Sequence, residues 1–191
     1  MYKRQLIGWT TFAIALVTYT LTLEPTVSYW DCGEYISTAV KLEVGHPPGA
    51  PLFQMLGAFF AMFTTDVMEI AKMVNFMSAL ASAFTILFMF WTITALGKKL
   101  VEKSYELTSS SYIAILGSGV VGALTYTFSD SFWFSAVEGE VYAMSSFLMA
   151  LLFWLGIRWE AEMDKPQGNK WLLLISFVVG LSFGVHILSL L

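Results

Sequence analysis

Two carboxylates and a histidine stand close together in a short polar stretch that follows a hydrophobic start. Asp31 and Glu34 are three residues apart, and His46 opens the Pro-rich segment His46-Pro47-Pro48-Gly49. A spacing of three residues places both carboxylates on one face if the segment is helical. A carboxylate can accept a proton from a hydroxyl nucleophile, and an imidazole changes its charge near neutral pH. Asp31 and Glu34 are therefore the candidate catalytic residues.

Structural roles compete with this interpretation of the polar stretch. Asp-x-x-Glu is also the pattern of a capping box, in which Asp31 would cap a helix and Glu34 would reach back to it. The rings of Tyr29 and Trp30 fit a wall for a sugar, and they fit an interfacial aromatic belt equally well. For His46 the alternative is a rigid connector that carries an incidental histidine. The spacing alone leaves these alternatives open.

A second set of polar groups occurs later in the chain. Glu138 has a capping role available through Ser135-x-x-Glu138, whereas Glu140 has no evident structural role. His186 lies in an apolar segment, where an ionisable side chain is either functional or a hydrogen-bonded packing residue. The predicted substrate-binding and donor-binding residues are Tyr29, Trp30, Lys41, His46, Glu138, Glu140, Tyr142 and His186. No recognised zinc spacing is present, so no metal site is expected.

The elements that must position these groups are membrane helices. The chain is 57% hydrophobic and only 13% charged, whereas soluble domains carry about 25% charged residues. We predict an all-α integral membrane fold with about five transmembrane helices and short interfacial helices in the first outer loop. The expected spans are residues 6–23, 74–96, 112–128, 141–157 and 171–191, and the outer loop covers residues 24–72. Residues 51–63 are apolar but too short to cross, which favours an interfacial or re-entrant helix.

The basic residues predict the orientation of these spans. With the N-terminus inside, eight of the ten lysines and arginines fall in inner loops, as the positive-inside rule requires. Both histidines and nine of the fourteen carboxylates then gather at the outer face. We therefore expect a multi-pass protein of a bacterial inner membrane, with a cytoplasmic N-terminus and a periplasmic active loop. In a eukaryote the corresponding membrane would be that of the endoplasmic reticulum.

A glycine-rich motif in the second half of the chain does not indicate a nucleotide-binding function. Gly117-Ser118-Gly119-Val120-Val121-Gly122 matches G-x-G-x-x-G, but it lies inside an apolar span, so we interpret it as helix packing rather than a dinucleotide site. No nucleic-acid partner is expected for such a chain.

The sequence stops at Leu191 within a hydrophobic segment. We expect it to be the N-terminal piece of a longer protein.

Three segments of the chain resemble the signatures of one membrane family. They are Trp30-Asp31-Cys32-Gly33-Glu34-Tyr35 together with residues 41–53, residues 136–142, and residues 180–186. These segments resemble glycosyltransferase family 117 of the GT-C superfamily. That family contains a transmembrane O-mannosyltransferase and bacterial relatives formerly of unknown function.

The resemblance implies the N-terminal part of a GT-C-type membrane domain. It implies transfer of a mannose-like hexose from a polyprenyl-phosphate donor to serine or threonine of a protein acceptor, on the outer face. By position Asp31 would be the base, and Glu34 would position the acceptor or the sugar. The implied partners are the bilayer, the lipid-linked donor and the protein acceptor, with no further cofactor. The main phosphate-binding residue would lie beyond Leu191, so this piece alone is expected to be inactive.

Two other classes of function compete with this hypothesis. A transporter or a flippase for lipid-linked sugars would use the same polar cluster as its substrate site, near the membrane midplane and often between inverted repeats. The expected gathering of polar groups at one face, without a visible repeat, favours the enzyme. A scaffold whose loops bind a partner is the third class, and it predicts that Asp31→Asn is functionally silent.

Overall fold

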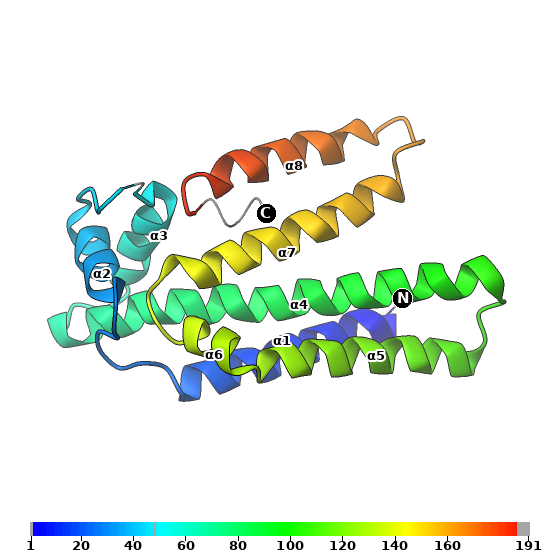
Figure 1. The fold of residues 1–191 in the computed structure, drawn as a ribbon, viewed down its shortest axis with the longest axis horizontal. Coiled ribbons are helices and arrows are strands. Elements are labelled where there is room, and N and C mark those ends of the chain that lie inside the picture. Colours follow the sequence, from blue (N-terminus) through cyan, green and yellow to red (C-terminus); the bar gives the residue numbers. More distant parts are fainter. Residues whose placement is uncertain (1, 48, 187–191) are drawn as a thin grey trace.

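The computed structural model describes residues 2–47 and 49–186, and this part of the chain is helical without strands. In chain order the elements are α1 (Tyr2–Leu21), α2 (Cys32–Lys41), α3 (Pro51–Ala61), the short 3-10 helix η1 (Val67–Glu69), α4 (Ile70–Ser104), α5 (Ser109–Thr127), α6 (Asp130–Ala136), α7 (Val141–Glu160) and α8 (Asn169–Ser182). The long helix α4 lies at the centre (Figure 1). It packs against α1 and α5 on one side and against α7 on the other, and α8 covers α7.

The predicted all-α membrane class is confirmed. Among the described residues, two helices are long and apolar enough to span a membrane, Val67–Ser104 and Val141–Glu160. The α5–α6 pair, bent by 68°, is a third candidate if it forms one span. The sequence led us to expect about five spans. Helix α1 has the length, but its threonines and tyrosines dilute its apolar character, and α8 has only 14 residues.

The last predicted span, residues 171–191, differs from the structure. Helix α8 ends at Ser182, and the following turn brings Gly184 back to the start of α3. The carbonyl of Gly184 accepts the backbone N–H of Leu52 at 2.7 Å. This contact satisfies one of the donors that the first turn of α3 leaves without an intrahelical partner. Residues 187–191 of the predicted span lie outside the described residues.

The first outer loop contains the two short helices that were expected there. Helix α3 begins at Pro51, which suits the first helical position because it has no N–H to satisfy. The loop is tied to α4 by the buried side chain of Asn75, which donates to the carbonyls of Glu24 at 2.7 Å and Thr26 at 2.9 Å. The N–H of Glu24 donates in turn to the carbonyl of Val137 at 3.1 Å. These bonds connect the loop after α1 to the segment between α6 and α7.

The glycine-rich segment of α5 packs against α4. A Cβ on Gly119 would lie 2.5 Å from the Cγ2 atom of Thr94 and 2.9 Å from the ring of Phe90. A Cβ on Gly122 would lie 2.7 Å from Ile93. Only glycine allows this approach of the two helices, which agrees with helix packing rather than a dinucleotide site.

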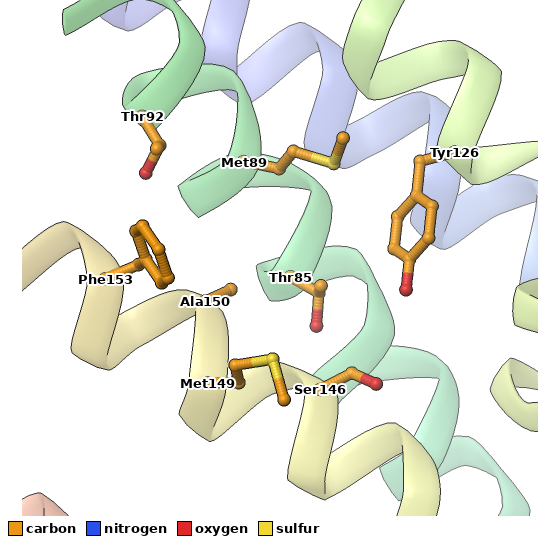
Figure 2. A pocket seen from close by; sticks show the side chains of 8 residues that line it. All are labelled: Thr85, Met89, Thr92, Tyr126, Ser146, Met149, Ala150 and Phe153. Atoms are coloured by element: carbon orange, nitrogen blue, oxygen red, sulfur yellow. The ribbon is translucent and has the colours of Figure 1, made fainter. Parts of the chain in front are cut away.

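A cavity of about 210 Å³ lies between the middle parts of α4 and α7 and the C-terminal end of α5. Figure 2 shows the side chains around it, with Thr85 and Met89 from α4, Tyr126 from α5, and Ser146 and Met149 from α7. The residues that line this cavity are apolar or carry hydroxyl groups, and none is a carboxylate or a base.

The two ends of the helical assembly differ in chemistry. The α4–α5 and α7–α8 connections lie at the end opposite to α2 and α3 (Figure 1). There Lys99 pairs with Glu160, and Arg158 pairs with Glu162 at 2.6 Å. The carboxylate–histidine cluster lies at the other end, beside α2. The structure therefore separates the basic loops from the candidate site along the helix axes.

Candidate functional site at the α2 end

A pocket of about 240 Å³ at the start of α2 contains Asp31. It also contains residues from the α6–α7 region, about 100 positions later in the sequence. The lining residues are Trp30, Asp31, Phe134, Ser135, Glu138, Glu140 and Tyr142. Five of these belong to the predicted site residues. The fold therefore brings the two polar clusters of the sequence together.

Asp31 precedes α2 directly, but its side chain does not cap the helix. No side-chain capping hydrogen bond is formed at this position, and the Glu34 carboxylate binds His46 instead of reaching back. The capping-box alternative is therefore wrong for this pair. The Asp31 carboxylate remains available at the wall of the pocket.

Trp30 has an unusual backbone conformation immediately before Asp31. Its φ angle is +60°, which lies in the left-handed region that bulky residues rarely adopt. Its side chain is 89% exposed, so apolar burial does not compensate for the strain. Strained residues of this kind are enriched at functional sites. The turn presents a large indole ring at the edge of the pocket.

The other wall of the pocket is the segment Glu138-Gly139-Glu140. The side chains of Glu138 and Glu140 are almost fully buried, with 3% and 5% of their surface exposed. Gly139 lies between them against α2 and α4, where a Cβ would be 2.9 Å from Oδ1 of Asn75 and 3.2 Å from Ile36. The absence of a side chain at Gly139 lets this segment approach α2 and α4 closely. A longer side chain would push both carboxyl groups away from Asp31.

The two buried carboxyl groups are not equivalent electrostatically. Burial, together with the charges of Glu138 and Asp31, raises the pKa of Glu140 to about 7, and a hydrogen bond from the Asp31 N–H partly opposes this rise. Burial also raises the pKa of Glu138, and a hydrogen bond from Ser28 partly offsets the effect. Within the described residues, Oε2 of Glu138 is buried without a hydrogen-bond partner. A buried acceptor left unpaired is costly, so a hydrogen-bond donor placed at this oxygen would be favourable.

The raised pKa of Glu140 predicts a pH-dependent stability. Between the ordinary value of 4.5 and about 7 the folded protein retains a proton that the unfolded chain releases. Stability should therefore fall as the pH rises through this window and level off above it. We expect Glu140→Gln to remove most of this fall. Thermal unfolding midpoints of the full-length protein in detergent from pH 4 to pH 8 test this, and equal slopes for both proteins would contradict it.

Glu34 and His46 form a compact pair beside Asp31. The carboxylate of Glu34 accepts the backbone N–H of His46 at 2.6 Å and lies 3.0 Å from the ring atom Nδ1. The other ring nitrogen, Nε2, lies 3.9 Å from Oδ2 of Asp31. The hydrogen bond to Glu34 raises the pKa of His46, and the charges of Glu34 and Asp31 act in the same direction. The imidazole is thus held between two carboxylates.

The same three side chains are the group within the described residues whose geometry could hold a metal ion. Asp31, Glu34 and His46 each offer one ligand atom, and these atoms lie within 4.8 Å of one another. In the structure the imidazole of His46 lies beside both carboxylates, with Nδ1 at 3.0 Å from Oε2 of Glu34 and Nε2 at 3.9 Å from Oδ2 of Asp31.

The remaining predicted residues lie at different distances from this cluster. The ring centroid of His186 is 5.8 Å from that of Tyr142, so His186 lies beside a residue that lines the pocket. Tyr29 is exposed beside Trp30. Lys41 is the last residue of α2, which places it about 15 Å along the helix axis from Asp31. Lys41 is therefore not brought to the pocket.

Sequence reasoning missed several residues that shape the site. Phe134 and Ser135 line the pocket, and Ser28 bonds Glu138. The sequence suggests only a helix-capping role for Ser135, but this residue lies near the end of α6 and does not cap a helix start. The one feature of the sequence that could have drawn attention to Asn75 is its polar amide within an apolar span. Such a residue must find partners, and here they are the carbonyls of the outer loop.

The family described as Protein O-mannosyl-transferase TMEM260 N-terminal domain matches residues 31–191, which begin at Asp31 and include the whole α6–α7 region. The chain belongs to this family. The match confirms the resemblance seen in the sequence.

Two curated relatives carry the same name. The chain is 29% identical over 147 residues to protein O-mannosyl-transferase tmem260 of Dictyostelium discoideum, covering 76% of this chain and 16% of that protein. It is 29% identical over 172 residues to protein O-mannosyl-transferase TMEM260 of Mus musculus, covering 90% of this chain and 22% of that protein. The chain thus spans about a fifth of the length of these relatives. No solved structure matches it significantly.

Proposed function

We propose that this chain is the N-terminal part of a membrane protein O-glycosyltransferase. The enzyme takes a mannose-like hexose from a polyprenyl-phosphate donor and transfers it to serine or threonine of a protein acceptor. The observation that carries the proposal is the pocket that joins Asp31 to two buried glutamates and an exposed tryptophan. The names of the relatives support the same class of reaction.

The side chains around the pocket suit a sugar and a hydroxyl nucleophile. Asp31 is the base: it accepts the acceptor's proton as the new C–O bond forms and the bond to the lipid phosphate breaks. The unpaired oxygen of Glu138 can accept a hydrogen bond from a sugar hydroxyl. Glu140, with a pKa of about 7, can donate or accept near neutral pH. The indole of Trp30 offers a flat apolar face on which the sugar ring can stack.

A separate apolar pocket supports a lipid-linked donor. It has a volume of about 500 Å³ and lies between the end of α1, α3 and the start of α4. Its lining residues are Thr20, Leu23, Phe59, Phe60, Phe63, Lys72, Met73 and Phe76. The four phenylalanine rings of this pocket offer apolar contacts to a branched hydrocarbon chain. Lys72 adds a positive charge, although Glu69 pairs with it at 3.0 Å.

The charge distribution supports an outer-face site. Basic residues gather at the end of the helices opposite to the pocket, which under the positive-inside rule is the cytoplasmic end. The pocket would then face the periplasm of a bacterium or the lumen of the endoplasmic reticulum. The leaving phosphate needs a cation or hydrogen-bond donors. His46 and His186 are the nearest candidates in this chain, and the rest of the protein must supply others.

A transporter or flippase remains the alternative class. It requires a polar substrate site near the middle of the membrane. The cavity in the middle of the helices holds hydroxyl groups but no ionisable carboxylate or histidine (Figure 2). The carboxyl groups gather instead at one end of the helices. This distribution favours chemistry at a membrane face.

Trp30 offers a test of the sugar-binding pocket. Trp30→Gly relieves a positive φ angle, so it should leave the folded protein at least as stable. It should raise the KM for the lipid-linked sugar about tenfold or more, because stacking on an aromatic face is lost, whereas Trp30→Phe should keep most of the affinity. The assay follows labelled sugar from polyprenyl-phosphate to peptide with the full-length protein in membranes. If the wild-type protein transfers no sugar from any donor tried, the proposed function is refuted. If the lipid-linked donor crosses the membrane while the peptide stays unlabelled, the protein is a flippase.

A further inference from the structure

Glu138 carries a buried carboxyl group with hydrogen-bonding capacity that the described part of the chain does not use. The residue is 3% exposed and lines the pocket that contains Asp31. Ser28 donates a hydrogen bond to this carboxyl group, but Oε2 has no partner among the described residues. The last torsion of a glutamate side chain is soft, so the group can turn and offer either oxygen to the pocket. One acceptor is therefore left over at the pocket wall.

Backbone contacts, rather than this carboxyl group, hold the segment in place. The carbonyl of Val137 accepts the N–H of Glu24 at 3.1 Å, and the carbonyl of Glu138 accepts the N–H of Glu140 at 3.0 Å. Gly139 packs closely against α2 and α4. The fold at this point does not require a carboxyl group at position 138.

The neighbouring Glu140 differs from Glu138 in its hydrogen bonding. The carboxyl group of Glu140 accepts the backbone N–H of Asp31. None of the ion pairs among the described residues includes Glu138 or Glu140. Of the two buried carboxyl groups, that of Glu138 is the one with an unused oxygen.

The other lining residues indicate which kind of ligand could donate to Glu138. The pocket has three aromatic side chains, Trp30, Phe134 and Tyr142, and its lining includes no lysine, arginine or histidine. Such a wall repels a phosphate, whereas it suits a neutral ring that has apolar faces and hydroxyl groups at its edge. The pocket volume of about 240 Å³ lies below the about 300–1,000 Å³ of pockets for drug-sized ligands. A single sugar ring meets these requirements.

We propose that Glu138 determines the sugar specificity of the protein, by accepting a hydrogen bond from one hydroxyl group of the transferred hexose. The inference rests on the proposed glycosyltransferase function, and it names the part of the donor that this pocket recognises. A donor without that hydroxyl group fits the same space but leaves the carboxyl group unpaired, so it is used less well. Glu138 forms no covalent bond in the reaction. It orients the sugar while Asp31 receives the proton of the acceptor.

The first experiment compares donor analogues in the wild type and in Glu138→Met. The donors are polyprenyl-phosphate hexoses that each lack one hydroxyl group, at carbon 2, 3, 4 or 6, and the full-length protein in membranes transfers them to peptide. Glu138→Met removes both oxygens and keeps the length of the side chain. For one analogue we expect kcat/KM of the wild type to fall about 10-fold to 100-fold below that of the intact donor, as for a lost hydrogen bond to a charged group.

The same loss should be absent in Glu138→Met, which should use that analogue and the intact donor with the ratio expected from their own reactivity. Comparing the ratios between the two proteins cancels this intrinsic reactivity, as in a double-mutant cycle. Glu43→Met removes an exposed carboxylate of the outer loop and is the matched control, with the wild-type pattern expected. If every analogue loses the same factor in Glu138→Met as in the wild type, Glu138 recognises no hydroxyl group and the proposal is overturned.

Thermal unfolding separates recognition from a structural role. Replacing a buried, incompletely paired carboxyl group by an apolar side chain of similar shape is nearly neutral or stabilising. Glu138→Met in detergent should therefore unfold at the wild-type temperature or above it. A lower unfolding temperature, together with a rate that falls equally for every donor, would show that Glu138 only supports the fold and would overturn the proposal.

Equilibrium binding distinguishes failure of this inference from failure of the proposed function. Isothermal titration calorimetry measures binding of the intact donor and the four analogues to the full-length protein in detergent. We expect the wild type to bind one analogue more weakly and Glu138→Met to bind all of them alike. This pattern without transfer to peptide would support the sugar site and count against the proposed function. Transfer by a wild type that binds all donors alike would count against the role of Glu138 alone.

Discussion

Asp31→Asn should strongly reduce sugar transfer by the full-length protein and leave the protein folded. The amide has nearly the same size as the carboxylate but cannot take a proton from the acceptor hydroxyl. General-base catalysis contributes about 100-fold to 10000-fold to such reactions, so we expect kcat to fall by at least about 100-fold. The Asp31 side chain makes no capping hydrogen bond, so α2 should remain intact. The measurement is initial-rate transfer of labelled sugar from polyprenyl-phosphate to peptide.

Two comparisons make this result specific. Asp66→Asn alters another exposed aspartate of the outer loop, where the side-chain oxygen accepts the N–H of Met68. An asparagine can keep that bond, so transfer should continue at the wild-type rate. Unchanged transfer in Asp31→Asn would move the base elsewhere. Glu140 would then be the stronger candidate, because Glu34 is already engaged by His46.

Gly139→Val should both destabilise the protein and eliminate transfer. A Cβ at this position would lie 2.9 Å from Oδ1 of Asn75, 3.2 Å from Ile36 and 3.3 Å from Val74. Adding atoms to a packed interior costs about 1–3 kcal/mol. The segment cannot move away without taking Glu138 and Glu140 out of the pocket. We therefore expect a lower unfolding temperature together with loss of sugar transfer.

Gly156→Val is the matched control for this prediction. It makes the same substitution in α7, at a glycine where a Cβ meets no atom within 4 Å. Unfolding temperatures in detergent and transfer rates in membranes are compared for the two variants. Equal behaviour of both would show that Gly139 is not a close-packing position. Normal stability with lost transfer in Gly139→Val would place its effect in the geometry of the pocket alone.

Local features of the sequence predicted most of the helical framework. A long apolar run can bury its backbone in a bilayer only as a helix, so α4 and α7 could be recognised without tertiary information. Pro51 marked the start of α3 because proline fits the first helical turn. The sequence did not predict that helix α6 follows α5 after a bend. The polar link after Phe128 resembled an ordinary loop. The early end of α8 was also missed, because its partner is the start of α3 and lies far away in the sequence.

The composition of the candidate site could be predicted, but its pairing could not. The sequence by itself determined that acidic, aromatic and histidine side chains follow the first helix and precede α7, because residue type and hydrophobic periodicity are local properties. Only the tertiary structure decided that Glu34 binds His46 rather than capping α2, that Glu138 and Glu140 meet Asp31, and that Lys41 stays apart. Those outcomes depend on contacts between distant segments, above all the approach of Gly139 to α2 and α4. No spacing along the chain encodes such an approach, because it follows from how whole helices pack.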